Sequence, residues 1–486
     1  MWLADLLTGF AVVEAEIELT HIALDSREIE AGGVFFAVAG AQQHGLQFAE
    51  KIQQQGGLAI VYDPAKNGEQ LAKNITALVM IAVEDLTEKL GEIAARFYAY
   101  PARQLNVIGI TGTNGKTSCS QFLAQLMDAS AVIGTLGWGE YAALQETRNT
   151  TPDAFAVQKI LAHFVATGIK NVAMEVSSHG LVQGRVNGVN FQGVIFNNLS
   201  RDHLDYHGSM QAYLQAKLRL VQWPGLKYVV VNLDDAYAER VLLAIPEGVR
   251  ILTYSMQNKV HAAQSSIIAS NVQYTMAGIE CDVRWQEEQA QLQVGLLGDF
   301  NLQNILAALT VMLAMGRPLM ACLQAIPSIK AVIGRMECFQ GGAGKPLVIV
   351  DYAHTPDALS KVLTTLRHHC NNTLTVIFGC GGERDKGKRG EMGRIAEQLA
   401  DRVIVTDDNP RFESGQAIIK DIIAEIETDK LSVINDRKSA IKYGIMTSSE
   451  QDIVLVAGKG HEDYQELEGI KHPFSDRDIV QTLLTL

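Results

Sequence analysis

The segment Thr111-Gly-Thr-Asn-Gly-Lys-Thr117 has the residue types and the order of a loop that binds phosphate. It follows the apolar run 105–110 and precedes a helix-like segment, so backbone N–H groups and a helix N-terminus would face a phosphate together. Lys116 would reach the β- and γ-phosphates of a nucleotide, and the Thr117 hydroxyl would hold Mg²⁺. The strict pattern has glycine where Ile110 stands. The strand–loop–helix context nevertheless favours a phosphate loop over an ordinary glycine turn.

Glu175, in Met174-Glu-Val-Ser-Ser-His179, ends what we predict to be the second strand of the same unit. Ligands of open parallel sheets bind at the carboxyl ends of the strands. A carboxylate there would complement the Mg²⁺ that accompanies a nucleotide. A helix N-cap or a buried salt bridge is the alternative role for this residue.

Two histidines and two aspartates lie within residues 202–207, a density that raises the question of a metal site. Their adjacent spacing suits zinc poorly. We interpret His203 as a ligand of a second Mg²⁺, with a structural His–Asp pair as an equal alternative. Lys217, judged from Tyr213-Leu-Gln-Ala-Lys217 alone, is typical of a solvated lysine on a helix.

Two polar loops follow predicted strands near the carboxyl end of the chain. Gly379-Cys-Gly-Gly-Glu-Arg384 has the composition of a second anion site, and Thr406-Asp-Asp-Asn-Pro-Arg411 ends another strand. Arg411 offers a planar fork that suits a carboxylate. Asp, Asn, Pro and Gly also form ordinary turns. Two such loops in one domain favour a binding cleft.

The elements that must position these residues are predicted to form an α/β protein. A length of 486 residues indicates about three domains. We place their boundaries at 1–101, 102–332 and 333–486. Apolar strands are expected at 33–38, 58–62, 78–83, 105–110, 171–176, 193–196, 228–231, 347–350, 374–378, 402–406 and 453–456, with a β-rich stretch at 251–297 and a packed helix at 299–315.

Composition excludes several classes of protein. The net charge of −13, without a basic block, argues against nucleic-acid binding. The segment 1–18 lacks the basic start of a signal peptide, and the longest uncharged run, 300–316, is shorter than the ~20 apolar residues of a membrane span. Six scattered cysteines without a Cys-x-x-Cys pair indicate neither disulfides nor a zinc site. We therefore expect a reduced, cytoplasmic protein without membrane insertion.

Six motifs in order resemble the Mur ligase family, most closely its diaminopimelate-adding type. They are Thr111-Gly-Thr-Asn-Gly-Lys-Thr117, Met174-Glu-Val-Ser-Ser-His-Gly180, Asn198-Leu-Ser-Arg-Asp-His-Leu-Asp205, Gly298-Asp-Phe-Asn-Leu-Gln-Asn304, Val350-Asp-Tyr-Ala-His-Thr-Pro356 and Asp408-Asn-Pro-Arg411. The resemblance covers essentially the whole chain. It implies a three-domain architecture with an N-terminal domain for the UDP substrate, a central P-loop ATPase domain and a C-terminal, Rossmann-like domain for the incoming amino acid.

The resemblance also implies the site residues. ATP would be bound by Gly112, Thr113, Asn114, Gly115, Lys116, Thr117, Ser118, Asn304, Arg335 and Asp351. The UDP substrate would be bound by Leu24, Ser26, Gln42, Asn149, Thr150, Thr151, Ser177, Gln183 and Arg185. The diaminopimelate pocket would comprise Arg384, Asp408, Asn409, Pro410, Arg411, Gly458 and Glu462. The segment Ala41-Gln42-Gln43 departs from the His-Gln that the family often has there.

The implied catalytic residues are Lys116, Lys217, Glu175 and His203. Lys217 matches the lysine that such enzymes carry as a carbamate, which replaces the solvated interpretation given above. Thr117, Glu175, His203 and the carbamate of Lys217 would hold two Mg²⁺ ions.

The implied activity is the ATP-dependent addition of meso-2,6-diaminopimelate to UDP-N-acetylmuramoyl-L-alanyl-D-glutamate through an acyl phosphate, by a monomer in the cytoplasm. Relatives that add lysine or a peptide, or that extend folate with glutamate, are the alternatives within the family. A nucleotide-dependent switch without ligation is the alternative from another class, although it would have no use for a cleft in the third domain.

Overall fold

The structure is a computed structural model that describes residues 1–40, 43–261, 265–427 and 429–485. The chain forms two compact units. One comprises residues 1–255, 259–266 and 307–316, and the other comprises 256–258, 267–306 and 317–486. Both units are α/β, as the sequence predicts. Among the described residues, no helix has the length and apolar character needed to cross a membrane.

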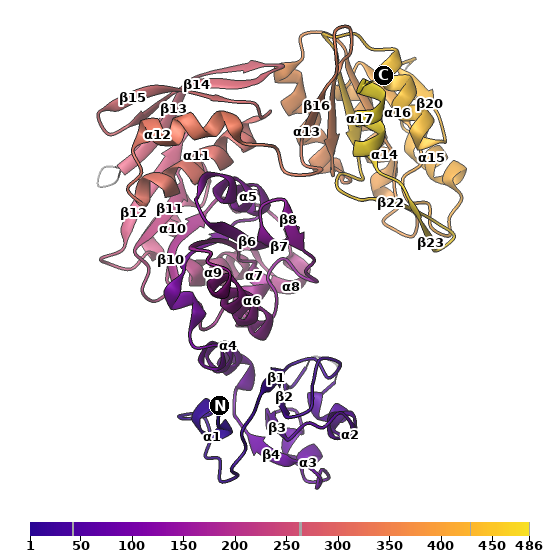
Figure 1. The fold of residues 1–486 in the computed structure, drawn as a ribbon. Coiled ribbons are helices and arrows are strands. Elements are labelled where there is room, and N and C mark those ends of the chain that lie inside the picture. Colours follow the sequence, from indigo (N-terminus) through magenta and orange to yellow (C-terminus); the bar gives the residue numbers. More distant parts are fainter. Residues whose placement is uncertain (41–42, 262–264, 428, 486) are drawn as a thin grey trace. The chain divides into compact units, whose positions relative to one another are not determined.

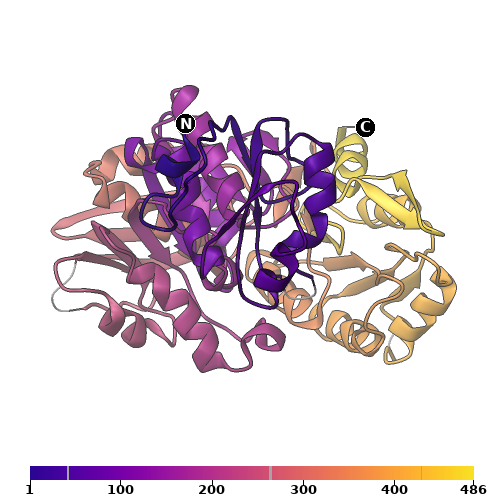
Figure 2. The same ribbon diagram turned by 90° about the horizontal axis from the view of Figure 1, so that it is seen from below.

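The first unit begins with a small parallel sheet in the order β1-β2-β3-β4, whose strands are labelled in Figure 1. Figure 2 shows this segment in indigo to violet from a second direction. Successive residues of β2 face opposite sides, so Val34 and Phe36 pack with the helices α1 and α4, whereas Phe35 and Ala37 pack with α2 and α3. Burial of both faces explains why β2 and β3 are continuous apolar runs. The elements are α1 (Leu3–Leu6), β1 (His21–Ala23), β2 (Gly33–Ala37), α2 (Ala49–Gln54), β3 (Ala59–Tyr62), α3 (Gly68–Ala72), β4 (Val79–Ala82) and α4 (Leu86–Phe97).

The same unit contains a larger sheet with strand order β12-β11-β10-β5-β9-β6-β7-β8. Its strands β12, β11, β10, β5, β9 and β6 are parallel, while β7 and β8 add antiparallel pairs at one edge. The elements are β5 (Asn106–Thr111), α5 (Lys116–Leu126), β6 (Ser130–Gly134), β7 (Gly137–Glu140), β8 (Ala143–Gln145), α6 (Ala154–Ala166), β9 (Asn171–Glu175), α7 (Ser178–Val182), β10 (Phe191–Phe196), α8 (Leu204–His207), α9 (Met210–Val221), β11 (Tyr228–Asn232), α10 (Ala238–Ala244) and β12 (Arg250–Ser255).

The predicted position of the Glu175 strand along the chain was wrong. The strand that ends at Glu175 is not the second of the unit, because β6, β7 and β8 precede it. It is nevertheless the spatial neighbour of β5, with Ile110 paired to Glu175. The glycines of β7 and the short β8 weakened the apolar pattern from which strands are predicted, so these elements were missed.

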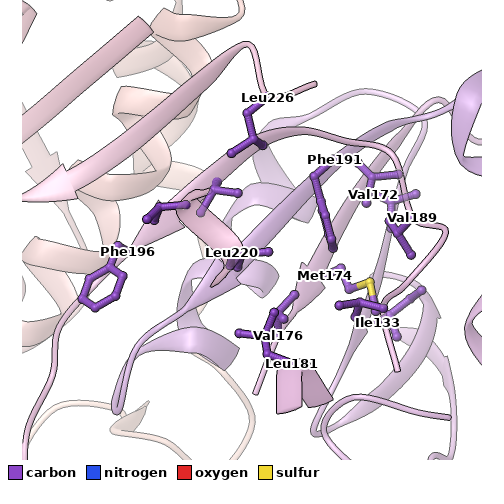
Figure 3. Packing of buried hydrophobic residues seen from close by; sticks show 14 of the residues in the cluster. Ile133, Val172, Met174, Val176, Leu181, Val189, Phe191, Phe196, Leu220 and Leu226 are labelled. Carbon is purple, nitrogen blue, oxygen red and sulfur yellow. The ribbon is translucent and has the colours of Figure 1, made fainter. Parts of the chain in front are cut away.

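The core of the larger sheet gathers alternate residues of its strands against α6, α7 and α9. Met174 from β9 and Phe191 from β10 lie in this cluster with Ile133, Leu181 and Leu220 (Figure 3). Each such side chain contributes about 1.5–3 kcal/mol when buried. The packing fixes the strand ends where the phosphate loop stands.

The second unit holds an antiparallel meander, β13-β14-β15, followed by helices and a six-stranded sheet in the order β16-β17-β21-β18-β19-β20. All strands of the latter except β16 run parallel. The elements, of which β13 and α11 have some residues in the first unit, are β13 (Ser265–Thr275), β14 (Gly278–Trp285), β15 (Glu288–Val294), α11 (Asp299–Ala314), α12 (Leu319–Ala325), β16 (Glu337–Gln340), β17 (Leu347–Asp351), α13 (Pro356–His369), β18 (Leu374–Phe378), α14 (Gly387–Leu399), β19 (Arg402–Val405), α15 (Gly415–Ile423), β20 (Leu431–Val433), α16 (Arg437–Met446), β21 (Ile453–Ala457), β22 (Tyr464–Leu467), β23 (Ile470–Pro473) and α17 (Asp476–Thr485).

Helices cover both faces of this parallel sheet (Figure 1). Ile349 of β17 packs with α13, α14 and α15, whereas the adjacent Val348 and Val350 pack with α16 and α17. A parallel sheet wound on both sides is the Rossmann-like arrangement that was expected. Such a fold presents its ligand-binding loops at the carboxyl ends of the strands.

Candidate active site

The loop Gly112–Gly115 connects the central strand β5 to the N-terminus of α5. Gly112 has φ 152° and Gly115 has φ 82°, conformations that favour glycine. A Cβ atom on Gly112 would come within 3.1 Å of Asn197 Cβ and 3.2 Å of the Asn198 nitrogen. Two glycines are therefore required for the loop to turn this tightly against its neighbour.

Asparagines at the end of β10 hold this loop from outside. Asn198 Oδ1 accepts a hydrogen bond from the Asn114 nitrogen at 2.9 Å, and the Asn198 carbonyl accepts one from the Thr113 nitrogen at 3.0 Å. Asn197 Nδ2 donates to the Asn114 carbonyl at 3.1 Å. The loop therefore keeps its shape through neutral groups that add no charge to it.

Two lysine amines converge on one carbonyl of the loop. Lys116 Nζ donates to the Gly112 and Thr113 carbonyls at 2.9 Å each, and Lys217 Nζ donates to the Gly112 carbonyl at 2.8 Å. Lys217 lies on α9, is 1% exposed, and has its Nζ 4.7 Å from the centre of the Tyr213 ring. The interpretation of Lys217 as a solvated lysine, based on its local pattern, is wrong.

Burial and the charge of Lys116 hold the pKa of Lys217 well below its usual range. Burial also lowers the pKa of Lys116, although the nearby Glu175 carboxylate opposes that effect. Neutral amines are nucleophiles, whereas ammonium ions are not. The lowered pKa favours the neutral form of the Lys217 amine.

Glu175 is buried at the end of β9, with both of its oxygens bonded. Oε2 accepts from Thr117 Oγ1 at 2.9 Å and from Thr135 Oγ1 at 3.0 Å, and Oε1 accepts from the Thr135 nitrogen at 2.9 Å. Burial raises the pKa of Glu175, against the lowering effect of these hydrogen bonds and of Lys116. A Cβ atom on Gly134 would stand 2.0 Å from Glu175 Oε1, so the carboxylate needs that glycine. Sequence reasoning missed Thr135, whose only signal was its place after a short strand.

The Thr117 hydroxyl and the Glu175 carboxylate form a pair of oxygen donors within hydrogen-bond distance, which suits a hard cation such as Mg²⁺. His203 does not contact this pair among the described residues. Its ring centroid lies 4.9 Å from that of His179, and its Nε2 lies 3.5 Å from Asp202 Oδ2. Its predicted role as a metal ligand stays a prediction.

The residues expected to hold the muramoyl dipeptide form one hydrogen-bonded group beside Glu175. Thr151 Oγ1 donates to the Glu175 carbonyl at 3.0 Å and accepts from the Ser177 nitrogen at 3.0 Å. Arg185 donates to the Thr151 carbonyl at 2.8 Å and, through Nε, to Gln183 Oε1 at 2.9 Å. On the same segment as Thr151, Thr150 Oγ1 lies 3.0 Å from Thr135 Oγ1, and Asn149 precedes it in the chain.

Leu24 and Ser26 line a pocket of about 950 Å³ in the first unit. Its wall includes the aromatic rings of Phe36 and Trp138 and the cations of Arg148 and Lys159. Apolar rings and cations are what a nucleoside joined to phosphates would need. Gln42 lies outside the described residues.

Three residues expected to contact the nucleotide belong to the second unit. Asn304 is buried on α11. The guanidinium carbon of Arg335 lies 4.7 Å from the centre of the Tyr352 ring. Asp351 ends β17 and accepts from the Met336 and Ala353 nitrogens at 2.7 and 2.8 Å. Burial raises the pKa of Asp351.

The residues of the expected diaminopimelate pocket come together at the carboxyl ends of β18, β19 and β21, which are adjacent strands. Arg411 Nη1 and Arg384 Cγ lie 3.0 and 3.7 Å from the position of a Cβ on Gly381. A Cβ on Gly458 would lie 2.6 Å from Asp408 Oδ2. Arg384 is exposed, while Asn409 and Pro410 are buried.

Arg411 has two of its three guanidinium nitrogens engaged. Nε donates to Glu466 Oε2 at 3.2 Å and Nη1 to the Gly382 carbonyl at 2.7 Å. Within the described residues Nη2 has no hydrogen-bond partner. The bidentate pairing with a carboxylate that was expected of Arg411 stays a prediction.

Buried ion pairs support this pocket, and sequence reasoning missed them. Arg437 is 1% exposed and donates to Asp476 Oδ1 and Oδ2 at 2.8 and 2.7 Å, as well as to the Asp407 and Ala457 carbonyls. It therefore ties the loop after β19 to the end of β21. Lys459, 0% exposed, contacts Asn409 and Glu462. The Arg437–Asp476 pair joins residues 39 positions apart, and Lys459 and Asn409 are 50 positions apart, so no local pattern reveals these contacts.

Three segments match domains of one family. Residues 18–98 match the catalytic domain of the Mur ligase family, 110–312 match the Mur ligase middle domain, and 334–460 match the glutamate ligase domain of Mur ligases. The expected boundaries at 101 and 332 remain predictions.

Individual proteins agree with these matches. The chain is 46% identical over 472 residues to UDP-N-acetylmuramoyl-L-alanyl-D-glutamate–2,6-diaminopimelate ligase of Pseudomonas aeruginosa, covering 96% of this chain and 95% of that one. A solved structure of a ligase of the same name superimposes with TM-score 0.76 at 34% identity, covering 100% and 98% of the two chains. The MurF ligase of Thermotoga maritima in complex with ADP shares the fold, with TM-score 0.60 at 17% identity and coverage of 91% and 95%. On this evidence, the chain belongs to the Mur ligase family.

Proposed function

We propose that the protein joins meso-2,6-diaminopimelate to the D-glutamyl γ-carboxylate of UDP-N-acetylmuramoyl-L-alanyl-D-glutamate, with ATP as the energy source. The name of the 46% identical relative, over nearly the full length of both chains, supports the choice of substrates. The observation that carries the chemistry is the convergence of Lys116 and the buried Lys217 on the Gly112 carbonyl, beside Glu175. A nucleotide switch would have no use for a second, reactive amine there.

The reaction must overcome the low reactivity of a carboxylate, from which oxide does not leave. Transfer of the γ-phosphoryl group of ATP to the γ-carboxylate forms an acyl phosphate and releases ADP. The neutral amine of the amino acid then attacks the carbonyl carbon, and phosphate leaves as the amide forms. Both steps bring anions together, so the site must supply positive charge.

Lys116 supplies that charge from the loop. Its hydrogen bonds go to neutral carbonyls, so its full positive charge remains available to the β- and γ-phosphates. The backbone N–H groups at the N-terminus of α5 add to this potential. Thr151 and Arg185 would fix the dipeptide end of the acceptor beside the loop.

Mg²⁺ would be held by Thr117, Glu175 and His203, with a second ion at a carbamate on Lys217. When bound, it would neutralise phosphate charge. The low pKa of Lys217 supports the carbamate, because only a neutral amine can attack carbon dioxide, forming the N–C bond and losing a proton. The proposal includes a monomeric protein that works in the cytoplasm, where ATP is available.

A phosphate-release assay with a panel of amino acids tests the proposal. We expect release to require both the UDP-dipeptide and diaminopimelate, with lysine and D-alanyl-D-alanine as poor substitutes. Release that needs neither substrate would indicate a plain ATPase. A clear preference for lysine or for D-alanyl-D-alanine would instead identify the protein as one of the alternative members of the family.

A further inference from the structure

Lys459 lies just after β21, and its ammonium group is completely enclosed by protein. The side chain is 0% exposed, and Nζ donates to Asn409 Oδ1 at 3.0 Å and to Glu462 Oε2 at 3.1 Å. A buried ammonium ion is tolerated only when it is paired in this way. Both partners belong to the expected diaminopimelate pocket, whereas Lys459 itself does not reach the surface.

Lys459 and Glu462 together decide which way the Asn409 amide points. Asn409 Nδ2 donates to Glu462 Oε2 at 3.0 Å, while Oδ1 accepts from Lys459 Nζ and from the Glu466 nitrogen at 2.9 Å. The opposite orientation would place the amide NH₂ against an ammonium group and the amide oxygen against a carboxylate. Without the lysine charge, only the Glu466 nitrogen would favour the present orientation at Oδ1.

Glu462 is held by one oxygen only. Both of its side-chain hydrogen bonds, from Lys459 and from Asn409, go to Oε2. Oε1 has no hydrogen-bond partner in the part of the chain that the structure describes. A carboxylate tied by one oxygen presents the other in a fixed direction, where it can accept a hydrogen bond from a substrate ammonium group.

Lys459 is not needed to join the strand ends, because Arg437 already does so. Arg437 donates to the Asp407 carbonyl after β19 and to the Ala457 carbonyl at the end of β21. The contacts of Lys459, by contrast, go to two pocket side chains. A purely structural role would not explain why Lys459 contacts pocket side chains while Arg437 joins the strand ends.

We propose that Lys459 is a positioning residue that sets the specificity pocket for the incoming amino acid. It holds Glu462 and Asn409 so that Glu462 Oε1 meets an ammonium group of the substrate. This inference rests on the proposed function, since it presumes that these loops receive a diamino acid.

The test measures Michaelis constants for all three substrates in Lys459→Met, which keeps the length of the side chain and removes its charge. We expect the KM for diaminopimelate to rise about ten- to a hundredfold. Without Lys459, Glu462 is no longer held in place, and its hydrogen bond to the ammonium group of the substrate is lost. The KM values for ATP and for the UDP-dipeptide should change less than about twofold. The change in kcat should be smaller than the change in the KM for diaminopimelate.

Asp452→Asn is the matched control, because Asp452 precedes the same strand at its opposite end. It is buried, and its carboxylate accepts from Asn372, Thr373 and Ser449. This variant should lower the thermal unfolding midpoint without a selective rise in the KM for diaminopimelate. A double variant with Glu462→Gln adds a second readout: Lys459→Met should raise that KM much less when Glu462 is already neutral.

An unchanged KM for diaminopimelate in Lys459→Met would overturn the proposal, and so would equal rises for all three substrates, which would make the role structural. If Lys459→Met does not fold, Lys459→Gln carries the same test, since it keeps a donor but not the charge. Failure of the proposed function would be distinguishable, because the wild-type protein would then not use diaminopimelate at all.

Discussion

The phosphate loop of the first unit and the amino-acid pocket of the second both stand at carboxyl ends of parallel strands, yet different forces hold them. The loop is shaped by glycine conformations and by the neutral side chains of Asn197 and Asn198. The amines of Lys116 and Lys217 donate to backbone carbonyls of the loop. Among the described residues, neither lysine forms an ion pair with a carboxylate.

The amino-acid pocket relies instead on charge paired with charge. Arg437 is bonded to Asp476, Lys459 to Glu462, and Arg411 to Glu466. Arg437 and Asp476 are fully buried; a buried pair of this kind adds little net stability, but removing one partner costs about 3–5 kcal/mol. These ion pairs fix the positions of the side chains in the pocket, but each pair leaves no net charge.

The difference follows from the ligands. A nucleotide carries charge of one sign, so the loop must keep the charge of Lys116 unpaired and take its shape from neutral groups. An amino acid with two ammonium and two carboxylate groups has both signs at fixed separations. Its pocket must therefore hold each charged side chain in one orientation, and the salt-bridge partner of that side chain fixes the orientation.

The largest effect is expected from Lys116→Ala. Loss of an unneutralised charge at the phosphates should lower kcat by about a thousandfold or more. The fold should persist, because the glycine turns and the two asparagines shape the loop. Steady-state kinetics with circular dichroism checks both parts. Turnover of Lys116→Ala near that of the wild type would contradict the assignment of residues 111–117 as a phosphate loop.

Lys217→Ala should lower activity by about a hundredfold or more, because the carbamate that would hold the second Mg²⁺ is lost. Bicarbonate or short carboxylic acids should restore part of the activity by replacing the missing anion. Lys217→Arg is the control, because a guanidinium group cannot form the carbamate and should stay inactive with or without the additives. Full activity of Lys217→Arg would contradict the carbamate and leave a simple cation in its place.

Arg411→Ala tests whether the charges of the second pocket select the substrate. Diaminopimelate differs from lysine by one carboxylate, and loss of a charge-assisted contact to it should cost of order 3 kcal/mol, about a hundredfold in kcat/KM. The value for lysine should change little. Equal losses for both amino acids would make Arg411 a structural residue held by Glu466, and the two sites would then differ less than we infer.

The smallest effect concerns stability and separates the two buried lysines. In the part of the chain that the structure describes, Lys217 forms no ion pair with a carboxylate. Its lowered pKa means that, over a range of pH, the unfolded chain binds a proton that the folded chain does not. Wild-type stability therefore rises with pH through the interval between the lowered pKa and the unfolded value near about 10.4.

Lys217→Met lacks this dependence, so it should be more stable than the wild type at neutral pH. Its advantage should shrink as pH rises toward about 10. Thermal unfolding in buffer free of carbon dioxide measures the difference without carbamate formation. Lys459→Met, whose lysine is paired, should instead be destabilised. A destabilised Lys217→Met at neutral pH would contradict the pKa direction.

Much of this architecture was predictable because its signals are local. The apolar runs of β5, β17, β18, β19 and β21 and the glycine–lysine loop lie in continuous stretches of sequence. The short strands β7 and β8 were not predicted, since three or four residues with glycine carry no clear period. The contact between Thr135 and Glu175 was likewise not predictable, because Thr135 follows β6 and Glu175 ends β9, and these strands pair only in the folded sheet.

The sequence by itself determined the α/β class, the phosphate loop and the polar loops at strand ends, because each depends on neighbouring residues. Only the tertiary structure decided which charges are buried and with what partners. Lys217 meets the Gly112 carbonyl from 105 residues away, and Lys459 meets Asn409 across 50. Whether a lysine is solvated, paired or left as a reactive amine depends on the surface that packs over it, and that surface comes from distant parts of the chain.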